Sequence, residues 1–457
     1  MTRLNDERGL PLTGLDAAQI ERYDALLTEL YSYIPGVQNR LEALVQEAPG
    51  FVLGQVLRGY SIMTDGLRSG LPQARQYLAQ AEQLAAGATE RERLHISALR
   101  AWIDGHLAQR LQALEDIVLR WPLDLLAYRQ LTGMLFWTGD KRRQLAAALQ
   151  AVPHWGPQIP GYRLVLGPLA FALEEAGHYT LAESHARKAL DYRATDLWAL
   201  HALAHVLEMQ GRVREGEQML AAVGKRLNDF NLFRGHLWWH LALFKLALGR
   251  DDEVLRLWDE QIFPEPSAFY LDQQNAASML ARLEIQGLAV GRRWEKVAQA
   301  AEQTQGQHLV LFTVPHQAMA LARTGRLPAL AQTLSAIEAE AKAGVEQAPL
   351  AAAVSAAMAL YCEGAHRPFL QRMRALRHEA QALGASHAQQ DLFFQLMVDA
   401  ALRLDDTALA KSLLKERLTG RLSSADHWPQ LAGQFMRIDQ ESDPKALRTL
   451  LRSGLEK

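Results

Sequence analysis

Hydrophobic residues recur at three- and four-residue intervals through almost every segment longer than ten residues. The stretch with Ile20, Tyr23, Leu26, Leu27 and Leu30 is typical of this spacing, which places apolar side chains on one face of a helix. Strict two-residue alternation, the mark of a half-buried strand, is almost absent. The pattern predicts an all-α protein.

Glycines interrupt this helical pattern at nearly regular intervals. They stand at Gly139, Gly177, Gly211, Gly249, Gly291, Gly325 and Gly364, separated by 38, 34, 38, 42, 34 and 39 residues. Such intervals are typical of helical hairpins of the tetratricopeptide kind, whose repeat is about 34 residues long. Beyond them, Leu404-Asp405 takes the place of the glycine in one more hairpin.

These hairpins predict an α-solenoid, curved into a superhelix with a concave channel. We expect residues 1–457 to form a single domain. Within it, residues 1–138 are divergent N-terminal helices, residues 139–365 the clearest tetratricopeptide-like repeats, and residues 366–457 the C-terminal repeats and cap.

Composition narrows the classes of function. The 49 Lys and Arg nearly balance the 51 Asp and Glu, so we expect neither nucleic acid nor a membrane surface as partner. The lone Cys362 excludes an intrachain disulfide and suits a reducing compartment. The start of the sequence lacks the apolar core of a secretory signal, and no apolar run reaches the roughly 20 residues of a membrane span. We therefore expect a cytoplasmic protein without nucleotide-binding loops of the GxxxxGK[ST] or GxGxxG type.

Histidines gather in two consecutive first helices of the repeat. His201, His205 and Glu208 share one stripe of HALAHVLEMQ, and HLWWHLALFKLALG repeats the four-residue spacing with His236 and His240. Helices in contact lie about 8 to 10 Å apart, so the two pairs can converge on one ligand in the concave channel.

Other residues complete the candidate site. They are His316 on a later first helix, Asp272 and Asn275 on the intermediate one, and Trp198 and Trp239 as aromatic walls.

Four interpretations of this constellation remain open. His201, His205, Glu208, His236 and His240 can be metal ligands, and nitrogen with carboxylate ligands suits zinc or non-haem iron. The glutamate follows the second histidine, so the HExxH mechanism does not apply. Without metal, His205, His240 and Glu208 can act as general acids and bases. The groups can also bind a small polar molecule or a peptide without chemistry, or satisfy one another structurally.

The shape of the channel separates a pocket from a scaffold. A scaffold for a peptide or protein partner would present an open groove over many repeats. An enzyme or metal protein would enclose a pocket between two or three of them.

Several segments carry a family resemblance: GLPLTGLDAAQIERYDALLTELY, LRGYSIMTDG, HALAHVLEMQGRVREGEQML, HLWWHLALFKLALGRDDEVLRLWDEQI and SMLARLEIQGLAVGRRWEKVA. They span residues 9 to 300, and HxxxHxxE followed by HxxxH is their specific part. The sequence resembles the tetratricopeptide repeat protein 38 family and its bacterial members. The resemblance implies an α-solenoid of tetratricopeptide-like repeats in a soluble intracellular protein, and it supplies no reaction or ligand. The segment LDQQNAASML departs from the family's more acidic, serine-rich version.

Overall fold

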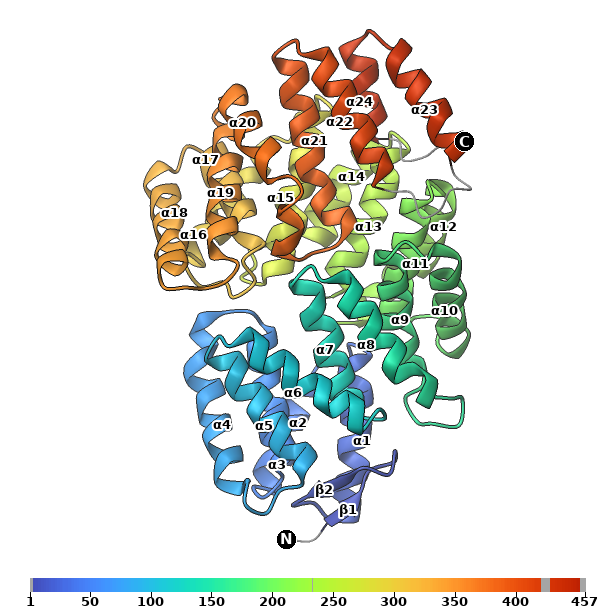
Figure 1. Ribbon diagram of the computed structural model, residues 1–457, viewed down its shortest axis with the longest axis vertical. Coiled ribbons are helices and arrows are strands. Elements are labelled where there is room, and N and C mark those ends of the chain that lie inside the picture. Colours follow the sequence, from blue (N-terminus) through green and yellow to red (C-terminus); the bar gives the residue numbers. More distant parts are fainter. Residues whose placement is uncertain (1–2, 232, 421–427, 453–457) are drawn as a thin grey trace.

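The computed structural model describes residues 3–231, 233–420 and 428–452. They form an α-solenoid of tetratricopeptide-like hairpins, as predicted, with the N-terminal helices at one end and the C-terminal helices at the other (Figure 1). The N-terminal elements are β1 (Arg3–Asn5), β2 (Pro11–Thr13), α1 (Ala17–Tyr31), α2 (Val37–Glu47), α3 (Val52–Thr64), α4 (Leu71–Leu84), α5 (Glu90–Ile103) and α6 (Leu107–Arg120).

The central hairpins are α7 (Leu125–Trp137) with α8 (Lys141–Ala151), α9 (Arg163–Glu175) with α10 (Tyr179–Tyr192), α11 (Leu197–Met209) with α12 (Val213–Val223), α13 (Arg234–Ala247) with α14 (Asp251–Leu257), and α15 (Tyr270–Ile285) with α16 (Arg293–Gln303). The C-terminal hairpins are α17 (Thr313–Arg323) with α18 (Leu327–Lys342), α19 (Ala348–Cys362) with α20 (His366–Leu376), and α21 (His387–Arg403) with α22 (Thr407–Thr419). The short η5 (Ala380–Leu383) precedes α21, and α23 (Trp428–Gln440) and α24 (Pro444–Arg452) end the described part.

At every break but one, the glycine ends a first helix in the left-handed conformation. Gly211 has a φ of 70°; its N–H donates to the Glu208 carbonyl, and the next N–H, of Arg212, reaches back to Leu207. This is the Schellman arrangement, in which glycine is favoured because a Cβ would be strained. Asp405 adopts a φ of 58° at the corresponding place, which confirms the hairpin predicted there.

One break differs from the expected register. Helix α15 ends at Ile285 and its C-terminal glycine is Gly287, with a φ of 80°, whereas Gly291 lies just before α16. The longest glycine interval in the sequence therefore contains a short connection as well as the repeat.

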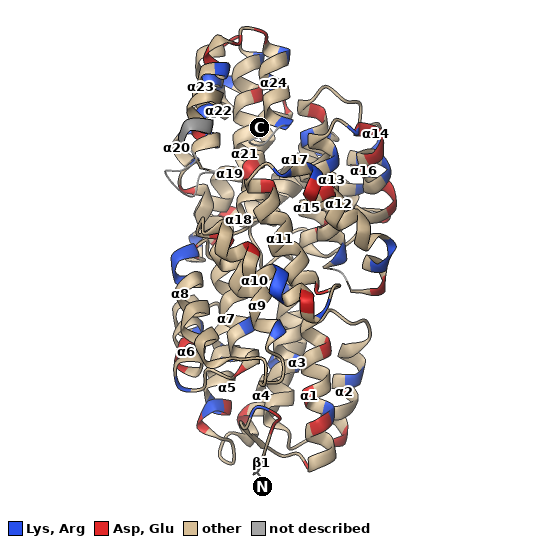
Figure 2. Ribbon diagram, turned by 90° about the vertical axis from the view of Figure 1, so that its right-hand side faces the viewer, with Lys and Arg blue, Asp and Glu red and all other residues tan. Residues whose placement is uncertain are grey.

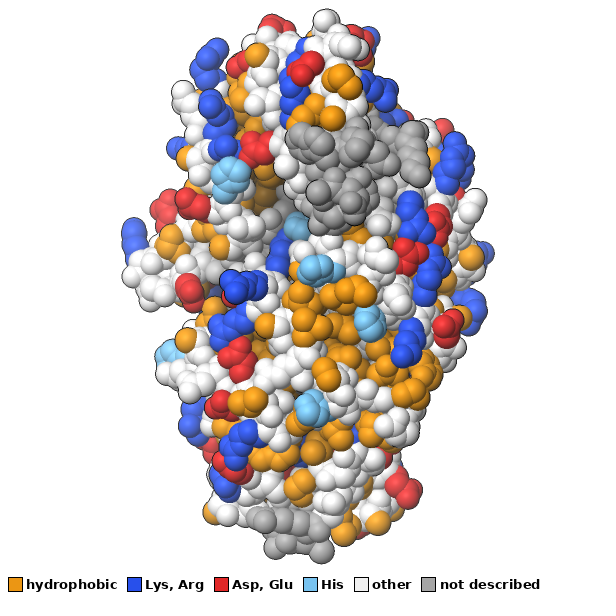
Figure 3. Space-filling model, turned by 45° about the vertical axis from the view of Figure 1, so that its right-hand side comes forward, with side chains coloured by type: hydrophobic (Ala, Val, Ile, Leu, Met, Phe, Trp, Pro, Cys, Tyr) orange, Lys and Arg blue, Asp and Glu red, His pale blue; other side chains and the backbone are white. Residues whose placement is uncertain are grey.

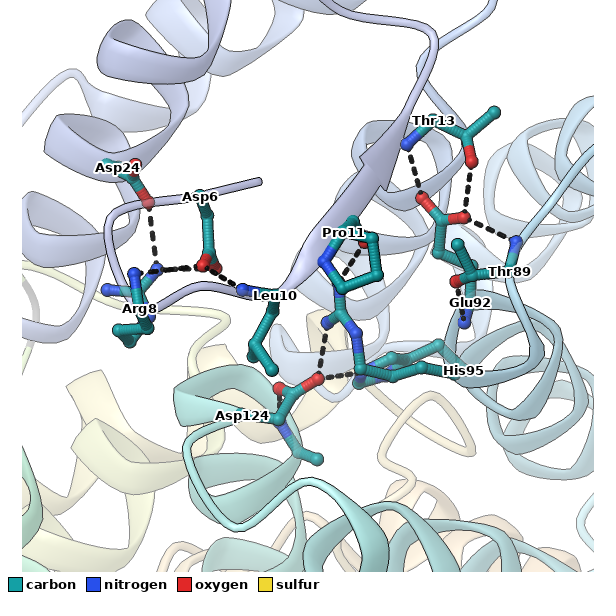
Figure 4. A network of polar contacts seen from close by, with 12 residues as sticks. Asp6, Arg8, Leu10, Pro11, Thr13, Asp24, Thr89, Glu92, His95 and Asp124 are labelled. Carbon is teal, nitrogen blue, oxygen red and sulfur yellow. Dashed lines mark hydrogen bonds and ion pairs between the residues drawn. The ribbon is translucent and has the colours of Figure 1, made fainter. Parts of the chain in front are cut away.

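The chain begins with an antiparallel β-hairpin that the helical pattern did not predict. Strands β1 and β2 pair with Leu4 opposite Leu12. Buried side chains of α5 hold the hairpin: Glu92 accepts bonds from Thr13, and Arg91 donates to the Pro11 carbonyl (Figure 4). Three-residue strands are too short to show a two-residue period, so the pattern could not reveal them.

The solenoid curls until segments far apart in sequence touch. The N–H of Arg68, after α3, donates to the Gln307 carbonyl at 2.7 Å. The Gln347 side-chain amide, before α19, donates to the Trp137 carbonyl at the end of α7 at 2.9 Å. The backbone N–H of His387 donates to the Glu175 carboxylate at 3.1 Å, which brings the start of α21 against the end of α9. The concave side is consequently closed in by the later repeats.

Charges of both signs are interspersed along the helices (Figure 2). Within residues 3–231, 233–420 and 428–452, no helix has the length and hydropathy needed to cross a bilayer.

Candidate functional site

Four histidines from α11 and α13 converge in the interior. His201 and His205 lie one turn apart on α11, and His236 and His240 one turn apart on α13, the neighbouring first helix. The facing ring centroids are 4.5 to 5.1 Å apart, and one nitrogen of each ring lies within 4.8 Å of the others. At most 3% of each residue is exposed. The predicted histidine cluster is confirmed.

The second nitrogen of three of these rings faces an oxygen outside the cluster. Nδ1 of His236 lies 2.9 Å from the Asn275 amide oxygen. Nδ1 of His240 lies 3.5 Å from a Glu208 carboxylate oxygen. These contacts leave Nε2 of both rings for the centre of the cluster.

His205 follows the same pattern on the other side of the cluster. Its Nδ1 lies 3.6 Å from a carboxylate oxygen of Glu174, while its Nε2 lies 3.0 Å from Nε2 of His201. A proton on Nδ1 of His205 would face this carboxylate, and the Nε2 lone pair would then point into the cluster.

Burial determines the protonation of the cluster. Burial, and then the neighbouring imidazoles, lower the pKa of His201, His205 and His236 well below the usual value. Burial and then the Arg282 guanidinium lower the pKa of His240 to about 3. All four rings are therefore neutral at pH 7, the state in which imidazole donates a lone pair.

Aromatic rings enclose the histidines. Trp239 stacks on His236 at 5.1 Å with an angle of 11° between the planes, and its indole N–H donates to Ser278. Trp198 lies 5.3 Å from His201, and Phe171 lies 5.0 Å from the same ring. Both predicted tryptophans thus border the cluster, and the apolar walls exclude water from it.

Two other predicted residues lie elsewhere. His316, on α17, has its Nδ1 2.9 Å from the Phe312 carbonyl and packs against Phe312 and Phe393. Asp272, near the start of α15, accepts a bond from Ser267, and burial raises its pKa to about 6. Among the described residues, neither belongs to the set of histidines that share a centre.

Sequence reasoning missed a second group beside the cluster, made of Glu174, Glu175 and His387. One signal was available: Glu174 stands three residues before Gly177, as Glu208 stands three before Gly211. In both hairpins this glutamate faces a histidine of the next first helix. His387 arrives only through the closure of the solenoid, which hairpin spacing does not encode.

A cavity of about 40 Å³, lined by both polar and apolar side chains, adjoins Glu208. Arg282, Asp391 and Arg417 contribute to its lining. The volume exceeds the roughly 10–15 Å³ that one water molecule needs, so solvent can approach the carboxylate behind His240.

No protein-family model matches the chain. In structure it is similar to a Rap protein complexed with competence and sporulation factor, at 11% identity over 84% of this chain and 99% of that chain, with a TM-score of 0.43. It is also similar to the human IFIT1 dimer with m7Gppp-AAAA, at 14% identity over 93% of this chain and 96% of that chain, with a TM-score of 0.36. A third similar structure is the tetratricopeptide domain of P58(IPK), at 13% identity over 78% of this chain and all of that chain, with a TM-score of 0.23. The fold of this chain is assigned from its own helical hairpins and does not depend on these similarities.

Proposed function

We propose that the chain binds one transition-metal ion through Nε2 of His201, His205, His236 and His240. The observation that carries the proposal is the convergence of one nitrogen from each of the four rings within 4.8 Å. It is supported by the oxygens on the outer side of the cluster, which lie 2.9 Å from Nδ1 of His236 and 3.5 to 3.6 Å from Nδ1 of His240 and His205. Histidines that ligate a metal almost always donate their other N–H to a carboxylate, carbonyl or water in this way. Glu208 then orients His240 and is not itself a ligand.

The donor set suits zinc or non-haem iron. In a tetrahedral zinc site with bonds of about 2.0–2.1 Å, neighbouring nitrogens lie roughly 3.3 Å apart. The distance between Nε2 of His201 and Nε2 of His205 is 3.0 Å, which is close to this value. Four histidines complete such a site, which is then structural. Iron with six ligands would keep two positions for a substrate. Acid–base chemistry by His205, Glu208 and His240 belongs instead to the alternative in which no metal is bound.

Elemental analysis of protein purified without a polyhistidine tag tests the proposal. We expect at least one zinc or iron per chain, with X-ray absorption reporting nitrogen ligands near 2.0–2.1 Å. His240→Gln should lose the ion that the four histidines bind. His316→Gln is the matched control, because His316 is equally buried and lies outside the cluster, and it should keep the metal.

A metal content in His240→Gln equal to that of the wild type, or protein that remains metal-free after incubation with zinc and iron, contradicts the proposal. Capture of a peptide by metal-free protein, dependent on residues from many repeats, would instead support the scaffold function. We favour the metal because the histidines are enclosed rather than spread along a groove.

We further propose that the chain is a cytoplasmic member of the tetratricopeptide repeat protein 38 family. Its HxxxHxxE and HxxxH segments support this membership, because they provide the four clustered histidines and Glu208. Loss of the metal from a second family member after the equivalent histidine change would test whether the family shares the site.

A further inference from the structure

Two adjacent carboxylates lie at the end of α9, on the outer side of His205. Glu174 and Glu175 are both buried, and Nδ1 of His205 lies 3.6 Å from an oxygen of the first and 4.0 Å from an oxygen of the second. Nδ1 of His387, the first residue of α21, lies 3.8 Å from the other oxygen of Glu175. Each of these three residues, Glu174, Glu175 and His387, offers one ligand atom, and the three atoms lie within 4.8 Å of one another.

The charges of this group are incompletely matched. Lys141 pairs with Glu175 at 2.9 Å, and the backbone N–H of His387 donates to the same carboxylate. Within the described part of the chain, neither oxygen of Glu174 accepts a hydrogen bond from a donor group, although the residue is completely buried. Burial and the adjacent Glu175 raise the pKa of Glu174 well above its usual value. A buried carboxylate in such a position needs a proton or a cation to compensate its charge.

We propose that Glu174, Glu175 and His387 bind a second divalent cation. Two carboxylate oxygens and one imidazole nitrogen suit a first-row ion such as manganese, iron or zinc. Bonds of about 2.0–2.2 Å place opposite ligand atoms up to roughly 4.4 Å apart, so side-chain shifts of a few tenths of an ångström close the site. Lys141 contacts the same Glu175 oxygen that faces His387, and its charge reduces the negative charge that remains.

The ring of His205 lies between the two cation positions. Its Nε2 faces the four-histidine cluster and its Nδ1 faces the carboxylates. A cation on the Glu174 oxygen that lies 3.6 Å from Nδ1 of His205 changes the electrostatic environment of this ring, so binding at one position changes the affinity of the other. The second position goes beyond the proposed function, because its own three ligands do not belong to the four-histidine set.

The second position is also the more accessible one. The side chain of His387 is 30% exposed and that of Lys141 18%, whereas the side chain of His205 is fully buried. The surface is hollowed beside the C-terminal helices, with histidine and basic side chains at the edge of the hollow (Figure 3). The carboxylate position is therefore nearer to solvent than the four histidines.

Metal titration of chelator-treated full-length protein tests the proposal. Manganese and zinc, each added alone, are followed by calorimetry and by metal analysis after gel filtration. We expect two zinc ions per wild-type chain, and one each for Glu174→Gln and for His240→Gln. Glu183→Gln is the control, because Glu183 lies on the following helix and pairs with arginines, and it should bind two.

The two proposals can fail separately in this experiment. Unchanged wild-type stoichiometry in Glu174→Gln overturns the second cation position, whatever happens at the histidines. Unchanged stoichiometry in His240→Gln together with loss of one ion in Glu174→Gln overturns the four-histidine site and supports the carboxylate site.

Thermal unfolding provides a second readout that does not depend on stoichiometry. Without metal, Glu174→Gln should match or exceed the wild-type midpoint, because it removes one of two adjacent buried acids. With saturating zinc, the wild type should gain more than the variant, because each cation that binds only the folded state adds stability. An equal gain for both proteins would assign Glu174 a purely structural role and overturn the proposal.

Discussion

Replacement of Asp124 by Asn should loosen the N-terminal end of the solenoid. Asp124 is the N-cap of α7, where one oxygen accepts from the N–H of Ala127 at 2.8 Å. Its other oxygen lies 2.6 Å from a guanidinium nitrogen of Arg91 and 3.0 Å from Nε2 of His95. Arg91 in turn donates to the Pro11 carbonyl of the β-hairpin (Figure 4). One carboxylate thus joins α5, α7 and the hairpin.

The expected cost follows from burial of the ion pair. Both side chains of the Asp124–Arg91 pair are 2% exposed, and removal of one partner from such a pair costs about 3–5 kcal/mol. Asn keeps the size and the capping oxygen, so the change isolates the charge. Glu90→Gln is the control: Glu90 pairs with Arg120 from the first turn of α5, both side chains are exposed, and we expect little change in stability.

The assay is urea unfolding followed by far-ultraviolet circular dichroism, combined with limited proteolysis of the N-terminal segment. Acid should reduce the difference between wild type and variant. His95 and Arg91 hold the pKa of Asp124 far below its usual value against the effect of burial. The unfolded chain therefore takes up a proton first as pH falls below about 4, and the contribution of the carboxylate is lost there. A loss below about 1 kcal/mol at pH 7, or a difference that grows in acid, would refute the reasoning.

Three further predictions concern the site, its neighbourhood and the closure. Glu208→Gln should weaken metal affinity roughly 10- to 100-fold while His240 stays a ligand, as competition with a chromophoric chelator would measure; unchanged affinity would contradict the orienting role. The wild type should lose stability as pH rises from about 4 to 6, because Asp272, with a folded pKa of about 6, keeps in the native state a proton that the unfolded chain has released. Asp272→Asn should remove this loss, and parallel pH profiles of the two proteins would contradict the prediction. Gly139→Ala should lower the melting temperature more than Gly325→Ala. Both glycines have a φ near 70°, but a Cβ at Gly139 would lie 2.0 Å from a carbonyl oxygen of η5, whereas nothing lies within 4 Å at Gly325; equal losses would exclude this contact as the cause.

The repeat and the histidine pairs could be predicted because both depend on local periodicity. A glycine in the left-handed conformation ends a helix wherever it occurs, so its spacing gives the hairpins directly. Four-residue spacing places His201 beside His205 and His236 beside His240 on their helices, and first helices of neighbouring hairpins touch. The division of the chain into three regions within one domain stays a prediction.

The second half of the candidate site depends on long-range contacts. His387 reaches Glu175 across 212 residues of sequence, and this approach results from the curvature summed over many hairpins. Small changes of angle at each repeat set that curvature, and periodicity carries no information about them. The place of Asp272, next to Ser267 rather than among the histidines, likewise depends on how α15 is rotated about its axis.

The contact between α9 and the start of α21 also has a consequence for biosynthesis. Because domains of a nascent chain fold progressively as it leaves the ribosome, the hairpins that bear His201 and His240 can form while the segment that covers them is still being translated. During that interval the imidazoles are open to the surrounding solution. Once His387 docks, it covers the carboxylates beside His205. We therefore expect an ion that bound to the histidines before this step to exchange more slowly afterwards.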